Sequence, residues 1–144
     1  MALAIGVIPD DVRNLLIRIQ NDLFDVGADL CTPVVDEPKM EPLRVIQSQV
    51  DALEVAIDRY NAELASLRSF VLPGGTKEAA LLHVARTVSR RAERCTWAAI
   101  HAFGGGVNPL TAKYLNRLSD LLFVLARYAN RSVGDELWVP GANR

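Results

Sequence analysis

The sequence has few of the residues that build metal sites and disulfides. It contains two cysteines, Cys31 and Cys95, and two histidines, His83 and His101. The cysteines form no CxxC pair, and the histidines are too far apart along the chain to share a helical turn as metal ligands. We therefore expect no protein-bound metal, a reducing compartment in which both cysteines stay free, and structural roles for both histidines.

Long apolar runs and an excess of basic charge are also lacking. No run approaches the length of a membrane span, and we expect no signal peptide and a soluble, cytoplasmic protein. The net charge of −1 argues against a nucleic-acid-binding protein. Of the 16 basic residues, 13 are arginine and 3 are lysine. Arginine binds carboxylates and phosphates through paired hydrogen bonds, which favours anion recognition, although a GC-rich genome explains the bias equally well.

What the sequence does contain is helical periodicity, divided by proline and glycine into four segments. Asp10 and Asp11 suit the start of a helix, and Thr32-Pro33 ends it. Thr76 is a predicted N-cap, and Asn108 is a second one followed by Pro109. We expect helices over 10–31, 42–71, 77–103 and 109–129, followed by an irregular tail over 134–144.

Apolar residues repeat in steps of three and four along the predicted helices. Such a pattern predicts an all-α, up-and-down helical bundle with shallow crossing angles, formed by one domain over residues 1–144. In the helix over 77–103, the positions expected to face the core are Leu81, Ala85, Val88, Ala92, Cys95 and Ala99.

A second set of residues on that helix forms a charged arc. Arg86, Arg90, Glu93 and Trp97 fall on one side of the helix, roughly opposite Val88. We therefore expect them to point away from the core, where Arg90 and Glu93 form an ordinary surface pair worth well under ~1 kcal/mol. The other interpretation is an anion pocket, because two arginines one turn apart repel each other unless an anion lies between them.

Two further segments favour the anion pocket. Asn116 and Asp120 lie one turn apart on the fourth predicted helix, and beside two arginines they could hold ribose hydroxyls and phosphates. The loop FVLPGGT (70–76) places Phe70 beside a Gly-Gly turn and a helix N-terminus, which attracts anions. Phe70 could equally pack in the core, and the sequence leaves this alternative open.

The chain resembles the PduO-type ATP:cob(I)alamin adenosyltransferases in four blocks. These are IQNDLFDVGADL (19–30), FVLPGG (70–75), RTVSRRAER (86–94) and YLNRLSDLLFVLARYANR (114–131). The resemblance implies a five-helix, ferritin-like bundle that forms a homotrimer with active sites at subunit interfaces. It also implies an enzyme that transfers the 5′-deoxyadenosyl group of ATP to the cobalt of reduced cobalamin and releases triphosphate.

The resemblance assigns roles to individual residues. It implies catalytic roles for Phe70, Arg86 and Arg90, with Phe70 filling the lower axial face of the cobalt. ATP-binding positions are matched by Arg90, Glu93, Arg94 and Asn116, and Asp120 is matched to active-site support. The implied cofactors are ATP, Mg²⁺ and cobalamin, the last as a substrate. The implied partners are an adenosylcobalamin-dependent mutase and a flavin reductase, in an unspecified pathway.

The family's amino-terminal block has no counterpart in these 144 residues. That block contains a Gly/Thr-rich phosphate loop and an acidic stretch expected to pair with Arg86, whereas residues 1–7 look like the end of a helix. We expect either that an ATP-loop segment lies outside residues 1–144 or that the chain is an inactive paralogue. The corresponding alternatives for function are a non-catalytic carrier of nucleotide or corrinoid for a partner enzyme, and a purely structural oligomer.

Overall fold

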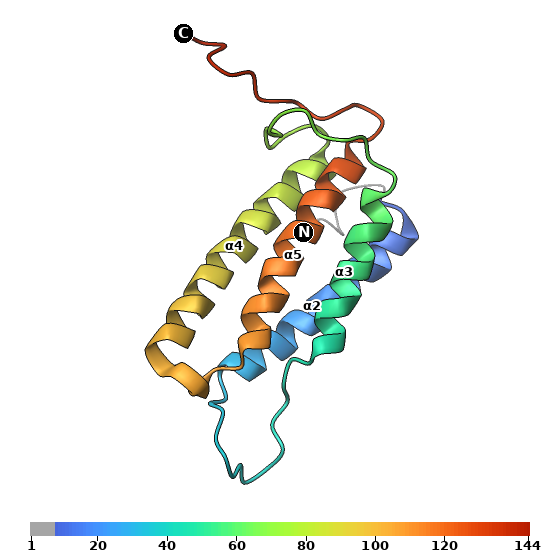
Figure 1. The fold of residues 1–144 in the computed structure, drawn as a ribbon. Coiled ribbons are helices and arrows are strands. Elements are labelled where there is room, and N and C mark those ends of the chain that lie inside the picture. The colour runs from blue at the N-terminus through green and yellow to red at the C-terminus, as the bar shows by residue number, and fades with distance from the viewer. Residues whose placement is uncertain (1–7) are drawn as a thin grey trace.

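The computed structural model describes residues 8–144, and over this range the fold is helical. Its elements are α2 (Asp10–Leu30), α3 (Gln47–Asn61), α4 (Lys77–Phe103), the short 3₁₀ helix η1 (Gly104–Gly106) and α5 (Pro109–Ala129). Figure 1 shows consecutive helices running in alternating directions, with α5 packed between α3 and α4. The predicted up-and-down helical bundle is therefore confirmed over the described residues. The helix end expected at 1–7 lies outside them.

The predicted ends of α4 and α5 are confirmed by their capping groups. The Thr76 hydroxyl accepts a hydrogen bond from the Ala79 amide at 3.2 Å, and the Asn108 side chain accepts one from the Leu110 amide at 3.1 Å. Gly104 ends α4 with a φ of 54°, a left-handed conformation that favours glycine. None of the helices in the described range is long and apolar enough to cross a membrane.

The helix predicted over 42–71 is wrong at both ends, because α3 spans only Gln47–Asn61. On the amino-terminal side, the buried Asp29 carboxylate accepts hydrogen bonds from the Arg44 guanidinium at 2.6 Å and the Val45 amide at 2.8 Å. These bonds tie residues 44–45 to the end of α2. The chain is consequently extended here instead of helical.

Beyond Asn61, the backbone groups bond to distant parts of the chain. The Ala65 carbonyl accepts a hydrogen bond from Arg127 of α5 at 2.7 Å. Residues 70–72 pair with the C-terminal tail, where the Trp138 amide donates to the Phe70 carbonyl at 2.8 Å and Val71 forms an antiparallel bridge with Leu137. These long-range bonds replace the helical ones that apolar periodicity predicted.

The orientation predicted for α4 is also wrong, because its charged arc packs toward α5. Glu93 is only 6% exposed, whereas Val84 and Val88 are 59% and 47% exposed. The Ser89 hydroxyl donates to the Leu115 carbonyl of α5 at 3.0 Å. Glu93 likewise accepts hydrogen bonds from Arg90 and from Asn116 of α5, so burying Ser89 and Glu93 costs much less than burying them without partners.

The predicted apolar positions of α4 instead face α2 across an open groove of about 390 Å³. The groove is lined from α2 by Leu16, Ile19 and Leu23, from α4 by Leu81, Val84, Ala85, Val88 and Ala92, and from α5 by Leu115, Leu118 and Leu122. Cys95, which was expected on the same side, is exposed. By contrast, the α5 positions that the same three-and-four spacing predicts to be buried are buried at Leu115, Leu118, Leu122 and Leu125, and Ala129 is partly buried.

Candidate functional site

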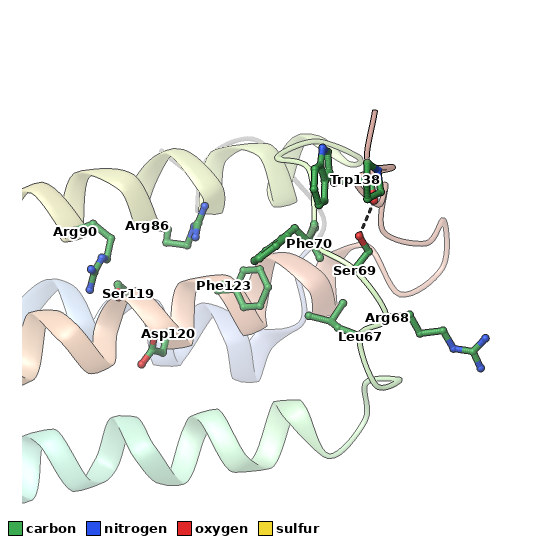
Figure 2. A pocket seen from close by; sticks show the side chains of 12 residues that line it. Leu67, Arg68, Ser69, Phe70, Arg86, Arg90, Ser119, Asp120, Phe123 and Trp138 are labelled. Carbon is green, nitrogen blue, oxygen red and sulfur yellow. Dashed lines mark hydrogen bonds between the residues drawn. The ribbon is translucent and has the colours of Figure 1, made fainter. Parts of the chain in front are cut away.

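An open cavity of about 830 Å³ lies where α4 and α5 meet the loop before α4 and the C-terminal tail. Figure 2 shows two arginines from α4, an aromatic ring and a carboxylate from α5, and two aromatic rings at the end of the bundle. Its volume is within the range of small-molecule sites. Its wall includes the side chains of Phe70, Arg86, Arg90, Asp120, Phe123 and Trp138.

Phe70 presents an apolar ring to this cavity. It is 76% exposed, so the alternative in which it packs in the core is wrong. Its ring centroid lies 5.8 Å from that of Trp138, and the neighbouring Ser69 hydroxyl donates to the Trp138 carbonyl at 2.6 Å (Figure 2). The pairing with the tail therefore sets where the exposed ring of Phe70 lies.

Arg90, Glu93 and Asn116 form one hydrogen-bonded chain across α4 and α5. The buried Glu93 carboxylate accepts from the Arg90 guanidinium at 2.5 Å through one oxygen and from the Asn116 amide at 2.8 Å through the other. The Arg90 side chain is half exposed at the cavity. On its other side Glu93 borders a polar cavity of about 420 Å³, which Asn116 and Trp97 also line. These hydrogen bonds thus orient the Arg90 side chain while leaving guanidinium N–H groups available to an anion.

Arg86 is half-buried and carries its charge at the cavity wall. Its guanidinium carbon lies 5.6 Å from the centre of the Phe123 ring, within the range of a cation–π contact. Within residues 8–144, no carboxylate forms an ion pair with Arg86. A cation without a local counter-charge at a cavity wall attracts an anionic ligand.

The remaining two candidates differ in position. Asp120 lines the cavity and forms an ion pair with Arg117 at 2.8 Å, one turn away on α5. Arg117 in turn donates to the Asn116 side chain at 2.6 Å, so Asp120 is connected through Arg117 and Asn116 to the Glu93 carboxylate. Arg94 is exposed and does not line the cavity.

Two cavity residues, Phe123 and Trp138, were not singled out from the sequence. Phe123 follows Asp120 by three positions on α5, so helical spacing alone could have placed it on the same side. Trp138 lies in a tail without periodicity, and it reaches Phe70 through pairing between distant segments. No local sequence signal could have found it.

The acidic groups of the site are already paired. Glu93 is bonded to Arg90, and Asp120 to Arg117. Among the described residues there is no cluster of three or more His, Cys, Asp and Glu side chains that could hold a metal ion. The site is therefore built from cations and aromatic rings, which suits an anionic and partly apolar ligand.

Several known proteins are similar to this chain in sequence and in fold. The family model for cobalamin adenosyltransferase matches residues 1–129. A corrinoid adenosyltransferase of Mycobacterium tuberculosis is 60% identical over 143 residues, which cover 99% of this chain and 74% of that protein. A corrinoid adenosyltransferase of Bacillus subtilis is 42% identical over 125 residues, which cover 87% of this chain and 62% of that protein.

Solved structures agree with these sequence relationships. A variant of the PduO-type ATP:corrinoid adenosyltransferase of Lactobacillus reuteri, complexed with cobalamin and ATP, superposes with a TM-score of 0.85 at 37% identity, covering 96% of this chain and 74% of that one. A second variant of that enzyme, complexed with ATP, gives a TM-score of 0.84 at 36% identity, covering 96% and 76%. With a family model that spans most of its length and relatives of this similarity, the chain belongs to the cobalamin adenosyltransferase family.

Proposed function

We propose that this chain transfers the 5′-deoxyadenosyl group of ATP to the cobalt of cob(I)alamin. The electron pair of Co(I) attacks C5′ of ATP, a Co–C bond forms, and the C5′–O bond breaks with its electrons leaving on the triphosphate. The products are adenosylcobalamin and inorganic triphosphate. The single observation that carries this proposal is a cavity with two arginines at its wall and exposed aromatic rings at its end.

Arg86 and Arg90 are proposed to act on the leaving triphosphate. Negative charge develops on the oxygen that departs from C5′, and guanidinium groups held beside it lower the barrier to that step. Arg90 is held by the buried Glu93 carboxylate, and Glu93 is held by Asn116. We assign Arg90, Glu93, Asn116 and the exposed Arg94 to ATP binding.

Phe70 is proposed to cover the lower axial face of the cobalt. A phenyl ring has no lone pair to donate, so a cobalt facing it loses its lower ligand and becomes easier to reduce to the nucleophilic Co(I) state. The exposed ring of Phe70 beside Trp138 supports this role. Asp120 is proposed to support the site through its ion pair with Arg117.

Mg²⁺ is proposed to enter with ATP, held by phosphate oxygens. The carboxylates nearest the cavity are paired with arginine, so the described residues supply no obvious ligand set for it. The ion neutralises phosphate charge when bound. The groups that this chain adds are the guanidiniums at the cavity wall.

For the assembly, we propose a five-helix form of the bundle, in one domain, that associates as a homotrimer. The apolar groove between α2 and α4 supports a further helix, because an exposed face of this length is rarely left uncovered.

The proposed setting is the cytoplasm, with a flavin reductase supplying electrons and an adenosylcobalamin-dependent mutase using the product.

The test is turnover by the purified full-length protein, with any segment outside residues 1–144 included, in the presence of ATP, Mg²⁺ and cobalamin kept reduced. Formation of adenosylcobalamin is followed by the change in its visible absorption spectrum. We expect product with the unaltered chain and a loss of at least about a hundredfold in kcat for Arg90→Ala, as when a group that stabilises transition-state charge is removed.

Arg91→Ala is the matched control, because Arg91 is the next residue along α4, is exposed, and does not line the cavity. It is expected to retain nearly full activity. Equal activity in both variants contradicts the role assigned to Arg90. Binding of cobalamin by calorimetry without any turnover of ATP would instead identify the chain as a carrier.

A further inference from the structure

Behind the wall of the cavity, three residues hold all the buried side-chain polar atoms without a hydrogen-bond partner in the range 8–144. These atoms are Nδ1 and Nε2 of His83, Nε of Arg86 and Oδ1 of Asp135. An unsatisfied buried polar group costs about 1–3 kcal/mol, so folded proteins hold few of them. Their concentration at one place, next to the proposed site, indicates a local role beyond packing.

The three residues come from different parts of the fold. His83 is 2% exposed and lies one turn before Arg86 on α4. Both contact the Phe123 side of α5: the His83 ring centroid lies 6.3 Å from that of Phe123, and the Arg86 guanidinium carbon lies 5.6 Å from it. Asp135 lies at the start of the tail that pairs with the Phe70 loop, and its other oxygen accepts from Arg127 at 2.8 Å.

The charges around His83 favour a neutral imidazole. Burial lowers the pKa of His83, the neighbouring positive charge of Arg86 lowers it further, and Asp135 partly opposes both effects. The charged groups that act on the ring are Arg86 on its own helix and Asp135 on the tail, and Asp135 is in turn paired with Arg127 of α5. A protonated His83 would add a second positive charge beside Arg86.

We propose that His83 is a positioning residue for Arg86, whose guanidinium the neutral imidazole backs and keeps over Phe123 at the cavity wall. This inference rests on the proposed function in one respect, that Arg86 acts on the anionic substrate. Protonation of His83 weakens the arrangement in two ways. It repels the guanidinium, and it draws the imidazolium toward Asp135 at the base of the tail.

The first test measures the coupling without requiring activity. The chain has only two histidines, so NMR of histidine labelled with ¹³C in the ring resolves the titration of each, with His101→Gln assigning the pair. In the ligand-free protein we expect His83 to titrate below the usual value of about 6.5. Arg86→Gln is expected to raise its pKa and Asp135→Asn to lower it. A His83 pKa that is the same in both variants overturns the proposal, whatever the chain's activity.

The second test measures the consequence for turnover. His83→Lys places a permanent charge behind Arg86 and is expected to lower kcat/KM for ATP about tenfold. His83→Gln stays neutral but lacks the ring that backs Arg86, so it is expected to lower kcat/KM for ATP about threefold, less than His83→Lys, at pH values above the His83 titration. We expect the activity of the unaltered chain to fall at acid pH as His83 becomes protonated, and His83→Gln is expected to lack this fall.

His101→Gln is the control for this profile, because His101 is the other histidine of α4 and is exposed. His101→Gln is expected to show the same fall in kcat/KM at acid pH as the unaltered chain. A fall in kcat/KM at acid pH that persists in His83→Gln overturns the proposal. Full activity of His83→Lys overturns it as well. If thermal melting by circular dichroism reveals that His83→Lys is unfolded, the profile of His83→Gln decides the question.

Discussion

Tyr60 illustrates how one residue makes stability depend on pH. It is 2% exposed, and its hydroxyl donates to the Asp11 carboxylate of α2 at 3.0 Å. Burial and then this hydrogen bond raise its pKa to about 12, from about 10 in an unfolded chain. The folded state therefore favours the neutral phenol, and the stability that Tyr60 contributes is complete below about pH 10 and lost as the pH rises toward 12.

We predict that Tyr60→Phe flattens the fall in unfolding free energy with pH over this window. The slope should decrease by up to about 1.4 kcal/mol per pH unit, the value for one titrating group. Urea denaturation at a series of alkaline pH values measures it. Burial also raises the pKa of Tyr114, so part of the slope should remain in Tyr60→Phe and disappear when Tyr114→Phe is added. A slope equal to that of the unaltered chain contradicts the prediction.

At the scale of elements, the junction between the Phe70 loop, α4 and α5 depends on one buried side chain. Asn130 follows α5, is 1% exposed, and donates to the Gly74 carbonyl at 3.1 Å. Its side-chain oxygen accepts from the Thr76 amide at 2.9 Å at the start of α4. Gly75 has a φ of 90°, and a Cβ built there would lie 2.3 Å from the Asn130 oxygen. The Phe70 loop, α4 and α5 can meet here because Gly75 has no side chain that would collide with Asn130.

We therefore predict that Gly75→Ala destabilises the chain by about 1–3 kcal/mol through backbone strain and displacement of Asn130. The matched control is Gly74→Ala, because a Cβ at Gly74 has no neighbour within 4 Å. It is expected to change stability by less than about 1 kcal/mol. Thermal or urea unfolding measures both, and equal losses would contradict the assigned role of Gly75.

At the scale of the whole molecule, the groove between α2 and α4 is an apolar surface that no described segment covers. Val88 at its wall is 47% exposed, and Leu23 on α2 is 39% exposed. We proposed above that a fifth helix covers it. The M. tuberculosis relative aligns with this chain over 74% of its length, and we propose that residues of that relative outside the match can supply such a helix.

We predict that a chimera of this chain with that remaining segment melts at a higher temperature and binds less of an apolar fluorescent dye. In the chimera Val88→Asp should cost about 2–3 kcal/mol because the charge becomes buried, whereas in the 144-residue chain it should cost less than about 1 kcal/mol. Val55→Asp is the control, since Val55 is 69% exposed on α3 and does not line the groove. A chimera in which Val88→Asp is as harmless as Val55→Asp refutes the fifth helix at this position.

The sequence by itself determined that the described chain folds into α-helices, the caps of α4 and α5, and the apolar side of α5, because these features arise from residues within one or two turns of each other. The family motifs contain Phe70, Arg86, Arg90 and Asp120, and these four residues line one cavity in the folded chain. Only the tertiary structure decided which side of α4 packs against α5, since buried polar groups such as Glu93 depend on partners from another helix. It also decided that α3 ends at Asn61 and that Trp138 meets Phe70, because hydrogen bonds between distant segments leave no periodic trace in either one.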